Sequence, residues 1–221
     1  MENRTIFFGD NLQVIEEKIP NNFFDLIYLD PPFNSNRNYN VLFKEGKVDS
    51  TAQIHAFEDT WEWTPATIKL FDELKENHNP QIAILIGSLY EIVGPTPMMA
   101  YLVNMTARLI PLRGVLKETG SIYLHCDPTA SHYLKIIMDI VFGKKNFRNE
   151  IVWHYKSFHG NVKQYFAKKH DIIFWYTKTD NWEFNRQFYT DLVDTIDASR
   201  WSQWLVDGSK IYGRYMPMQD S

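Results

Sequence analysis

The sequence predicts an α/β fold built around a parallel sheet, and three consecutive segments support this. Residues 5–8, TIFF, are a short run of high β-propensity that ends at a glycine. Residues 11–19 then place apolar side chains at helical spacing, namely Leu12, Ile15 and Ile19. Residues 23–29, FFDLIYL, are too continuously apolar for a half-exposed strand, so burial on both faces is expected. A strand, a helix and a buried strand in this order begin a parallel α/β sheet.

The same alternation returns in the second half of the chain. The pattern predicts a helix over 98–116 with a kink at Pro111, ended by KETG, then a strand over 121–127, a helix over 129–142, and strands over 150–155 and 170–177. The helix over 129–142 is amphipathic, and one face carries Leu134, Ile137, Met138 and Val141. These elements extend the sheet that the first thirty residues begin.

Residues 34–96 interrupt this alternation. They are polar, acidic and contain the tryptophan-rich run FEDTWEW, with one predicted helix near 65–77. We interpret them as a long insertion, and long irregular connections in compact domains are usually functional or mobile. Residues 1–180 are therefore predicted to form one domain with an insertion at 34–96. Residues 181–221 lack clean periodicity and are predicted to begin a separate, truncated segment.

Composition excludes several classes of protein. The 221 residues carry a net charge of -4, which argues against a generic basic coat for DNA. The longest apolar run, 82–90, is too short to cross a bilayer, and the N-terminal residues lack a signal-peptide pattern. A single cysteine, Cys126, excludes an internal disulfide and a cysteine-rich zinc site. It suits a reducing compartment, so a cytoplasmic location is expected.

The segment Asp30-Pro31-Pro32-Phe33 ends the predicted buried strand, and ligands of open α/β sheets bind beyond the carboxyl ends of strands. Two prolines fix the backbone, so a carboxylate, a carbonyl and an aromatic ring are held close together. This set suits a planar ring with an exocyclic amine, which stacks on Phe33 and donates to Asp30 and to the Pro31 carbonyl. Two acceptors would stabilise the charge that the amine gains when it attacks an electrophile. The alternative is a strand followed by a simple Pro-Pro turn.

Two further clusters contain polar residues at predicted strand ends. Asp10 and Asn11 follow Gly9, and Asp10 can be a plain N-cap of the helix over 11–19 or a contact for an adenosyl group. The run HCDP, 125–128, could suggest a metal site. Consecutive strand residues point to opposite faces, however, so a strand end with a helix cap is the preferred interpretation, and no metal site is predicted.

A basic and aromatic stretch over 154–170 is the candidate contact for nucleic acid. The segment 144–170 holds seven Lys and Arg residues and only Glu150 as an acid. Four lysines could contact backbone phosphates while nearby aromatic rings stack on bases, namely Lys156, Lys163, Lys168 and Lys169. A solvated loop is the alternative.

Taken together, these residues resemble the bacterial DNA amino-methyltransferases that modify N6 of adenine or N4 of cytosine. DLIYLDPPFNSN resembles their catalytic D-P-P-[YF] motif, and FFGDNL resembles the cofactor-adenine strand upstream of it. GSIYLHCDPTASHYLKIIMDIVFG followed by NFRNEIVW is similar to their next strand, helix and strand. The resemblance covers residues 4 to 178 and implies a Rossmann-like methyltransferase sheet.

The resemblance implies S-adenosylmethionine as methyl donor and DNA as partner, with a cognate restriction endonuclease as a further possible partner. It assigns Asp30, Pro31, Pro32 and Phe33 as catalytic, and Asp10, Asn11 and Asp30 as cofactor contacts. Asp before Pro-Pro favours adenine. The alternatives are N4-cytosine methylation, an RNA or protein amide target, and a catalytically silent nucleic-acid-binding fragment.

The arrangement is similar to the permuted subgroup, in which the glycine-rich cofactor loop comes last. No F-x-G-x-G-type loop follows residue 178. The resemblance therefore implies an incomplete sheet, with residues 1–180 as the catalytic part of a fragment. Residues 181–221 would then begin a linker or a target-recognition segment.

Overall fold

The computed structural model describes residues 4–32, 61–77, 79–155, 164 and 169–185, together with the backbone of 202–204 and 210–212. Contacts within the chain define two units, Met1–Trp182 and Glu183–Ser221, each described here by itself. None of the helices in the described ranges combines the length and apolar character needed to span a bilayer.

The first unit contains a mixed four-stranded sheet in the order β1-β2-β4-β3. The strands are β1 Phe24–Leu29, β2 Leu116–Cys126, β3 Phe147–His154 and β4 His170–Thr177. β1 is parallel to β2, with Leu29 opposite Leu124, whereas β4 runs antiparallel to both β2 and β3. The carboxyl ends of β1 and β2 therefore lie side by side.

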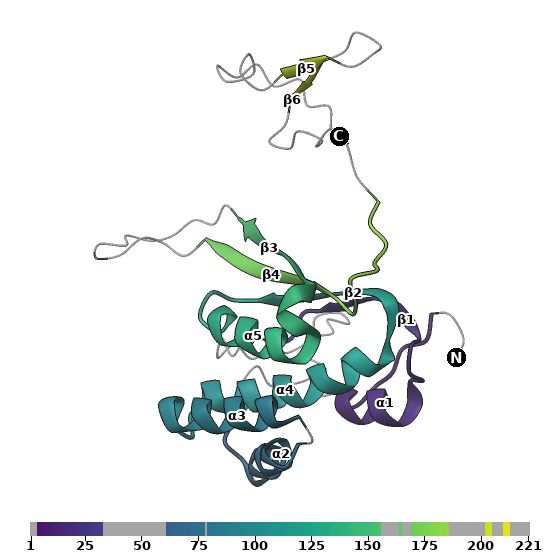
Figure 1. Ribbon diagram of the computed structural model, residues 1–221. Helices are drawn as coiled ribbons and strands as arrows, with labels where there is room; N and C mark the ends of the chain where they lie inside the picture. The colour runs from purple at the N-terminus through teal and green to yellow at the C-terminus, as the bar shows by residue number, and fades with distance from the viewer. Residues whose placement is uncertain are drawn as a thin grey trace, which may run out of the picture. The chain divides into compact units, whose positions relative to one another are not determined.

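Helices gather on one side of this sheet, as Figure 1 shows. They are α1 Asn11–Lys18, α2 Pro65–Lys75, α3 Pro80–Val93, α4 Pro97–Val115 and α5 Ser131–Met138, and α5 continues into the π-helical segment Asp139–Gly143 and the short 3-10 turn Lys144–Asn146. α4 is the central helix and contacts α1, α2, α3 and α5. Its residues 99–106 are all buried, because α4 packs against neighbours on several sides.

Three helices start with the same local signal. Proline occupies the first turn of α2, α3 and α4, where its missing N–H costs nothing and its fixed φ suits the helix. The residue before each proline is an N-cap whose side chain accepts a backbone N–H, namely Thr64, Asn79 and Thr96. These caps explain why the chain between Trp61 and Val115 folds as three successive helices.

The expected strand over 5–8 is not formed. Residues 5–8 have no regular structure, and the Ile6 and Phe8 side chains are 94% and 88% exposed. β-propensity needs a neighbouring strand to satisfy the backbone and cover the side chains, and the described sheet places no strand beside this run. The prediction of a strand here was therefore wrong.

Burial of β1 on both faces was also wrong. Ile27 faces the helices and is 8% exposed, whereas Leu26 and Tyr28 on the other face are 58% and 52% exposed. The described helices cover one face of the sheet, so a continuously apolar strand has only one buried side. The sheet is mixed rather than parallel because β3 and β4 join it as an antiparallel pair.

Other predicted elements differ in extent. Residues 61–96 hold α2, as predicted, and also α3, so this part of the insertion is mainly helical; residues 34–60 lie outside the described residues. KETG belongs to β2, and α4 continues through Pro111. The predicted apolar face of α5 and the turn after it is confirmed, since Leu134, Ile137, Met138 and Val141 are all buried. In the second unit, β5 Ser202–Trp204 and β6 Lys210–Tyr212 form an antiparallel pair that no pattern predicted.

Candidate active site

Asp30 directly follows the last residue of β1, as the sequence predicted. Because Leu29 pairs with Leu124 in the parallel β2, Asp30 comes beside His125. Its side chain is 62% exposed, whereas Pro31 and Pro32 are half-buried. Phe33 lies outside the described residues. The structure therefore presents a carboxylate to solvent at the carboxyl edge of the sheet, on a segment held by two prolines.

Asp30 belongs to a cluster in which the His125 imidazole lies between two carboxylates, those of Asp30 and Asp171. His125 Nδ1 lies 3.3 Å from Asp30 Oδ1, and His125 Nε2 lies 3.4 Å from Asp171 Oδ2. The Tyr28 hydroxyl is also 3.3 Å from His125 Nδ1. Burial, and then the Asp30 carboxylate, raise the pKa of Tyr28 above its ordinary value, so the phenol keeps its proton at neutral pH. These residues come from β1, β2 and β4, which are adjacent in the sheet.

Cys126 points to the opposite face of β2 and is fully buried. Burial raises the pKa of its thiol well above the ordinary value, and nearby carboxylates, Asp127 first, add to this. Asp127 accepts the backbone N–H of Ala130 and starts the turn before α5. HCDP is thus a strand end, as predicted, but Asp127 is not the cap of α5, whose N-cap is Ala130 without a side-chain hydrogen bond. Among the described residues there is also no group of His, Cys, Asp and Glu placed to hold a metal ion.

Asp10 is the N-cap of α1 and also an ion-pair partner. Gly9 reaches it with a φ of +133°, a backbone conformation that glycine adopts without strain. Asp10 Oδ1 accepts the backbone N–H of Leu12 at 2.9 Å and the Arg108 Nη2 at 2.9 Å. Its side chain remains 57% exposed. Asp10 therefore has the structural role that the sequence left open, and its carboxylate is still accessible to a ligand.

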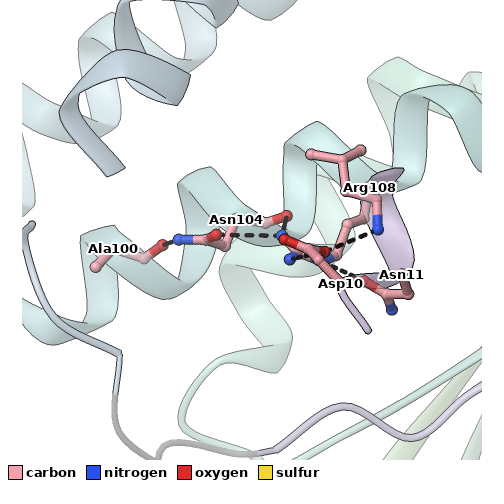
Figure 2. A network of polar contacts seen from close by, with 6 residues as sticks. Asp10, Asn11, Ala100, Asn104 and Arg108 are labelled. Carbon is pink, nitrogen blue, oxygen red and sulfur yellow. Dashed lines mark hydrogen bonds and ion pairs between the residues drawn. The ribbon is translucent and has the colours of Figure 1, made fainter. Parts of the chain in front are cut away.

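Arg108, on α4, joins several polar groups in the network of Figure 2. Its Nε donates to Asn11 Oδ1 at 2.7 Å, and its Nη1 donates to the Asn104 carbonyl and side-chain oxygens at 3.0 and 3.1 Å. The Asn104 amide in turn donates to the Ala100 carbonyl. The Arg108 side chain is only 14% exposed. The start of α1 is thus fixed to the central helix by the mostly buried Arg108 guanidinium.

Trp61 connects this network to the Pro-Pro segment. Its indole Nε1 donates to the Pro32 carbonyl at 3.3 Å, and the Arg108 guanidinium lies 5.9 Å from its ring centroid. The ring also contacts Tyr101 of α4, with centroids 5.7 Å apart. A contact chain therefore runs from Asp10 through Arg108 and Trp61 to Pro32, and it links the two predicted ends of the site.

A cavity of about 450 Å³ lies beside α1 and the start of β1. Its lining combines aromatic, aliphatic and polar residues, including Phe7, Gly9, Asn11, Val14 and Phe23. Such a mixture suits a nucleoside, and Asn11 is one of the predicted cofactor contacts. Asp10 and Asp30 are not among the lining residues, so this cavity does not include the two predicted carboxylates.

Of the four lysines predicted to contact DNA, only Lys169 is described. Its carbonyl accepts the Tyr155 N–H at 3.1 Å and closes the β3–β4 hairpin. Lys156, Lys163 and Lys168 lie outside the described residues.

Sequence reasoning missed Arg108, Trp61 and Asp171, and it considered His125 only as a metal ligand. Arg108 is 98 positions from its partner Asp10, so no local pattern could have paired them. For His125 the sequence did contain a usable signal. If the two strands are parallel neighbours, the end of the strand over 121–127 lies beside the end of the strand over 23–29, which brings His125 next to Asp30.

Comparison with known proteins agrees with the sequence motifs. A family profile described as DNA methylase, covering N6 and N4 methyltransferases, matches residues 24–203. The chain is 28% identical over 174 residues to the Mod subunit of the type III restriction-modification enzyme StyLTI of Salmonella typhimurium, covering 77% of this chain and 23% of that protein. It therefore spans about a quarter of that relative's length.

Two further similarities extend this picture. The type II methyltransferase M.KpnI of Klebsiella pneumoniae is 24% identical over 208 residues, covering 92% of this chain and 39% of that protein. Among solved structures, the cytosine-N4-specific PvuII DNA methyltransferase matches with a TM-score of 0.42 and 11% identity, over 87% of this chain and 60% of that one. Because the family profile spans most of the sequence, this chain belongs to the N6/N4 DNA methylase family.

Proposed function

We propose that this chain is part of a site-specific DNA methyltransferase that transfers a methyl group from S-adenosylmethionine to the exocyclic N6 of adenine. The observation that carries the proposal is the exposed Asp30 carboxylate, followed by Pro31-Pro32, at the carboxyl end of β1 in a chain of this family. Aspartate before the proline pair favours adenine over cytosine.

The chain's own residues would position and polarise the target amine. The amine lone pair is delocalised into the base ring, so the nitrogen is a weak nucleophile until acceptors hold its N–H groups out of the ring plane. Asp30 and the Pro31 carbonyl would supply two acceptors, and these stabilise the positive charge that develops on nitrogen. The Pro32 carbonyl already accepts the Trp61 indole N–H, and this contact holds the segment in place. Phe33 would stack on the base.

S-adenosylmethionine, when bound, supplies an electrophilic methyl group on a sulfonium. We propose that Asp10 and Asn11 contact its adenosyl end and Asp30 its reactive end. The accessible Asp10 carboxylate and the mixed cavity beside Asn11 fit an adenosyl group in chemical character. Arg108 would set the orientation of both side chains, since it donates to each of them.

DNA would contact the β3–β4 connection through Lys156, Lys163, Lys168 and Lys169. The similar StyLTI Mod subunit is named as part of a type III restriction-modification enzyme, and a restriction endonuclease would be the partner in such a setting. We propose the same setting for the protein that carries this chain.

The test is methyl incorporation by the complete protein that contains residues 1–221. Plasmid DNA is incubated with the enzyme and the methyl donor, digested to nucleosides and analysed by mass spectrometry. We expect N6-methyladenine in an amount far below the total adenine, as methylation of a subset of sites would give. If N4-methylcytosine is found instead, the target base is cytosine and the reaction class stays the same. If neither methylated base is found, the proposal is overturned.

A further inference from the structure

His125 is placed where the reaction would leave a proton. Its Nδ1 lies 3.3 Å from the carboxylate oxygen of Asp30, the residue assigned to hold the target amine. This separation is at the long end of hydrogen-bond distances, as catalytic contacts often are before substrate binds. The His125 side chain is only 16% exposed, whereas that of Asp30 is 62% exposed. The imidazole therefore sits behind the carboxylate, on its protein side.

The other ring nitrogen has an acidic partner from a different strand. His125 Nε2 lies 3.4 Å from Asp171 Oδ2, and the Asp171 side chain is 20% exposed. β2 and β4 are hydrogen-bonded neighbours in which His125 pairs with Ile173, so the sheet itself fixes this acid–imidazole contact. At 3.4 Å the Asp171 carboxylate is an ion-pair contact of the ring, and its negative charge beside Nε2 favours the tautomer that carries the proton on Nε2 and a lone pair on Nδ1.

Tyr28 is consistent with this tautomer. Its hydroxyl lies 3.3 Å from Nδ1, and burial together with the Asp30 charge keeps the phenol protonated. The phenol can therefore donate to the Nδ1 lone pair in the resting state. Around the His125 ring, Asp30 and Tyr28 then face Nδ1, and Asp171 faces Nε2.

We propose that His125 accepts, through Asp30, the proton that the target amine loses on methylation, and that Asp171 orients the ring for this transfer. This inference rests on the proposed function. The amine lone pair forms the N–C bond while the C–S bond of the donor breaks and its electron pair stays on sulfur. The methylated nitrogen then has one proton in excess. That proton passes to Asp30 and from Asp30 to Nδ1, which leaves a carboxylate beside an imidazolium paired with Asp171.

This transfer would matter most when DNA covers the exposed side of Asp30. Water could take the proton in the free protein, but a bound duplex and a base in the site would exclude it. The mostly buried His125 imidazole on the protein side then becomes the available acceptor, and it restores the Asp30 carboxylate for the next turnover.

The first experiment measures kcat and KM in the complete enzyme for His125→Asn and His125→Gln, which carry no basic nitrogen. General-base contributions are typically about 100-fold or more, so we expect kcat to fall by at least about tenfold with KM for DNA unchanged. His132→Gln, on the exposed surface of α5, is the matched control and should have the kinetics of the wild type. Added imidazole should partly restore the rate of His125→Gly, which a purely structural role would not allow.

Equal kcat for wild type and both His125 variants, with Asp30→Ala inactive, would overturn the inference and leave the proposed function intact. Loss of activity in every protein, wild type included, would instead count against the proposed function.

A second experiment needs no activity. In residues 1–221, the ¹⁵N shifts of the neutral His125 ring show which nitrogen carries the proton. We expect Nε2–H in the wild type and a mixture of tautomers in Asp171→Asn. A ring protonated at Nδ1 would donate to Asp30 and could not accept from it, and that result would overturn the inference whatever the enzyme's activity.

Discussion

Asp25 and Asp30 are two carboxylates at opposite ends of the same strand, and their surroundings differ. Asp25 is 76% exposed and is paired with the Lys117 Nζ at 2.7 Å on the surface. Asp30 follows the carboxyl end of β1, beside the mostly buried imidazole of His125 and two prolines. The position in the sheet, rather than the residue type, thus separates a surface ion pair from a candidate catalytic group.

The pair provides a matched test. In the complete enzyme Asp30→Ala should reduce kcat by at least about 100-fold, the usual scale for removing one transition-state acceptor. The melting temperature should not change, because the exposed side chain carries little of the fold. Asp25→Asn removes a surface ion pair worth about 0–1 kcal/mol and should leave kcat unchanged. Normal methylation by Asp30→Ala would contradict the assigned role.

Cys126 gives a prediction on reactivity and pH. Its buried thiol has a pKa well above the ordinary value, first because of burial, so the folded protein should react with Ellman's reagent only on unfolding. The raised folded-state pKa also means that the unfolded chain loses this proton first as pH rises. The contribution of Cys126 to stability should therefore be present below the ordinary thiol pKa and decrease above it. Urea unfolding of the wild type and of Cys126→Ala between about pH 7 and 10 checks this. The free energy of unfolding should decrease less steeply with pH in the variant than in the wild type. Rapid labelling of the folded protein by Ellman's reagent would contradict the predicted protection of the thiol, and an equal pH slope in both proteins would contradict the predicted stability effect.

At this scale the sequence located some residues of the candidate site and missed others. Asp30 was identifiable because its motif is local and ends a recognisable strand. Arg108 and Trp61 were not, because Arg108 meets Asp10 from 98 positions away and Trp61 meets Pro32 from 29. The alternation of side chains along a strand placed His125 and Cys126 on opposite faces of β2, but it gave no indication that Asp171 lies beside His125.

At the scale of elements, the predicted insertion contributes to the site through Trp61, just before α2. Thr64, Asn79 and Thr96 each precede a proline, and this repeated cap signal predicts three helix starts. It would have revealed α3, whose apolar run was considered only as a membrane span. In the described part of the insertion, α2 and α3 pack against α4. Trp61, which precedes α2, donates its indole N–H to the Pro32 carbonyl.

Trp61→Phe tests this connection. The change keeps an aromatic ring against Tyr101 but removes the N–H that the Pro32 carbonyl accepts, so the Pro-Pro segment should become less well positioned. We expect kcat to fall several-fold, with a stability loss of about 1 kcal/mol for one hydrogen bond. Trp63→Phe is the control, since Trp63 packs on Phe71 and Tyr90 instead. Equal kcat for both variants would show that the contact is not needed.

The β3–β4 connection gives a separate prediction about DNA. Changing Lys163, Lys168 and Lys169 to Ala should weaken binding to all sequences and reduce the salt dependence by up to roughly one counterion per lysine. The slope of log K against log salt, measured by fluorescence anisotropy, checks this. Lys69→Ala and Lys75→Ala on α2 provide a control of similar charge change. An unaltered slope in the triple variant would place the DNA elsewhere.

At the scale of the whole molecule, the sequence predicted strands but not their order. Apolar runs located β1 and β4 closely and missed the first residues of β2 and β3, and β3 is exposed over most of its length. Whether a run has two neighbours, one or none depends on partners remote in sequence. The run over 5–8 and the exposed face of β1 were mispredicted for that reason, since both assumed neighbours that the described part of the chain does not place there.

Binding of S-adenosylmethionine to residues 1–221 is the last prediction. The cavity beside Asn11 is lined by residues 4–24 and does not reach Asp30, and Asp10 is already paired with Arg108. No glycine-rich loop of the expected type follows residue 178 to hold the methionine end. Titration calorimetry should therefore give a Kd weaker than about 10 μM, or about -7 kcal/mol. Asp10→Asn should weaken it further if the adenosyl end binds there, whereas Asp25→Asn should not. Binding tighter than about 10 μM would show that these residues already form a working cofactor site.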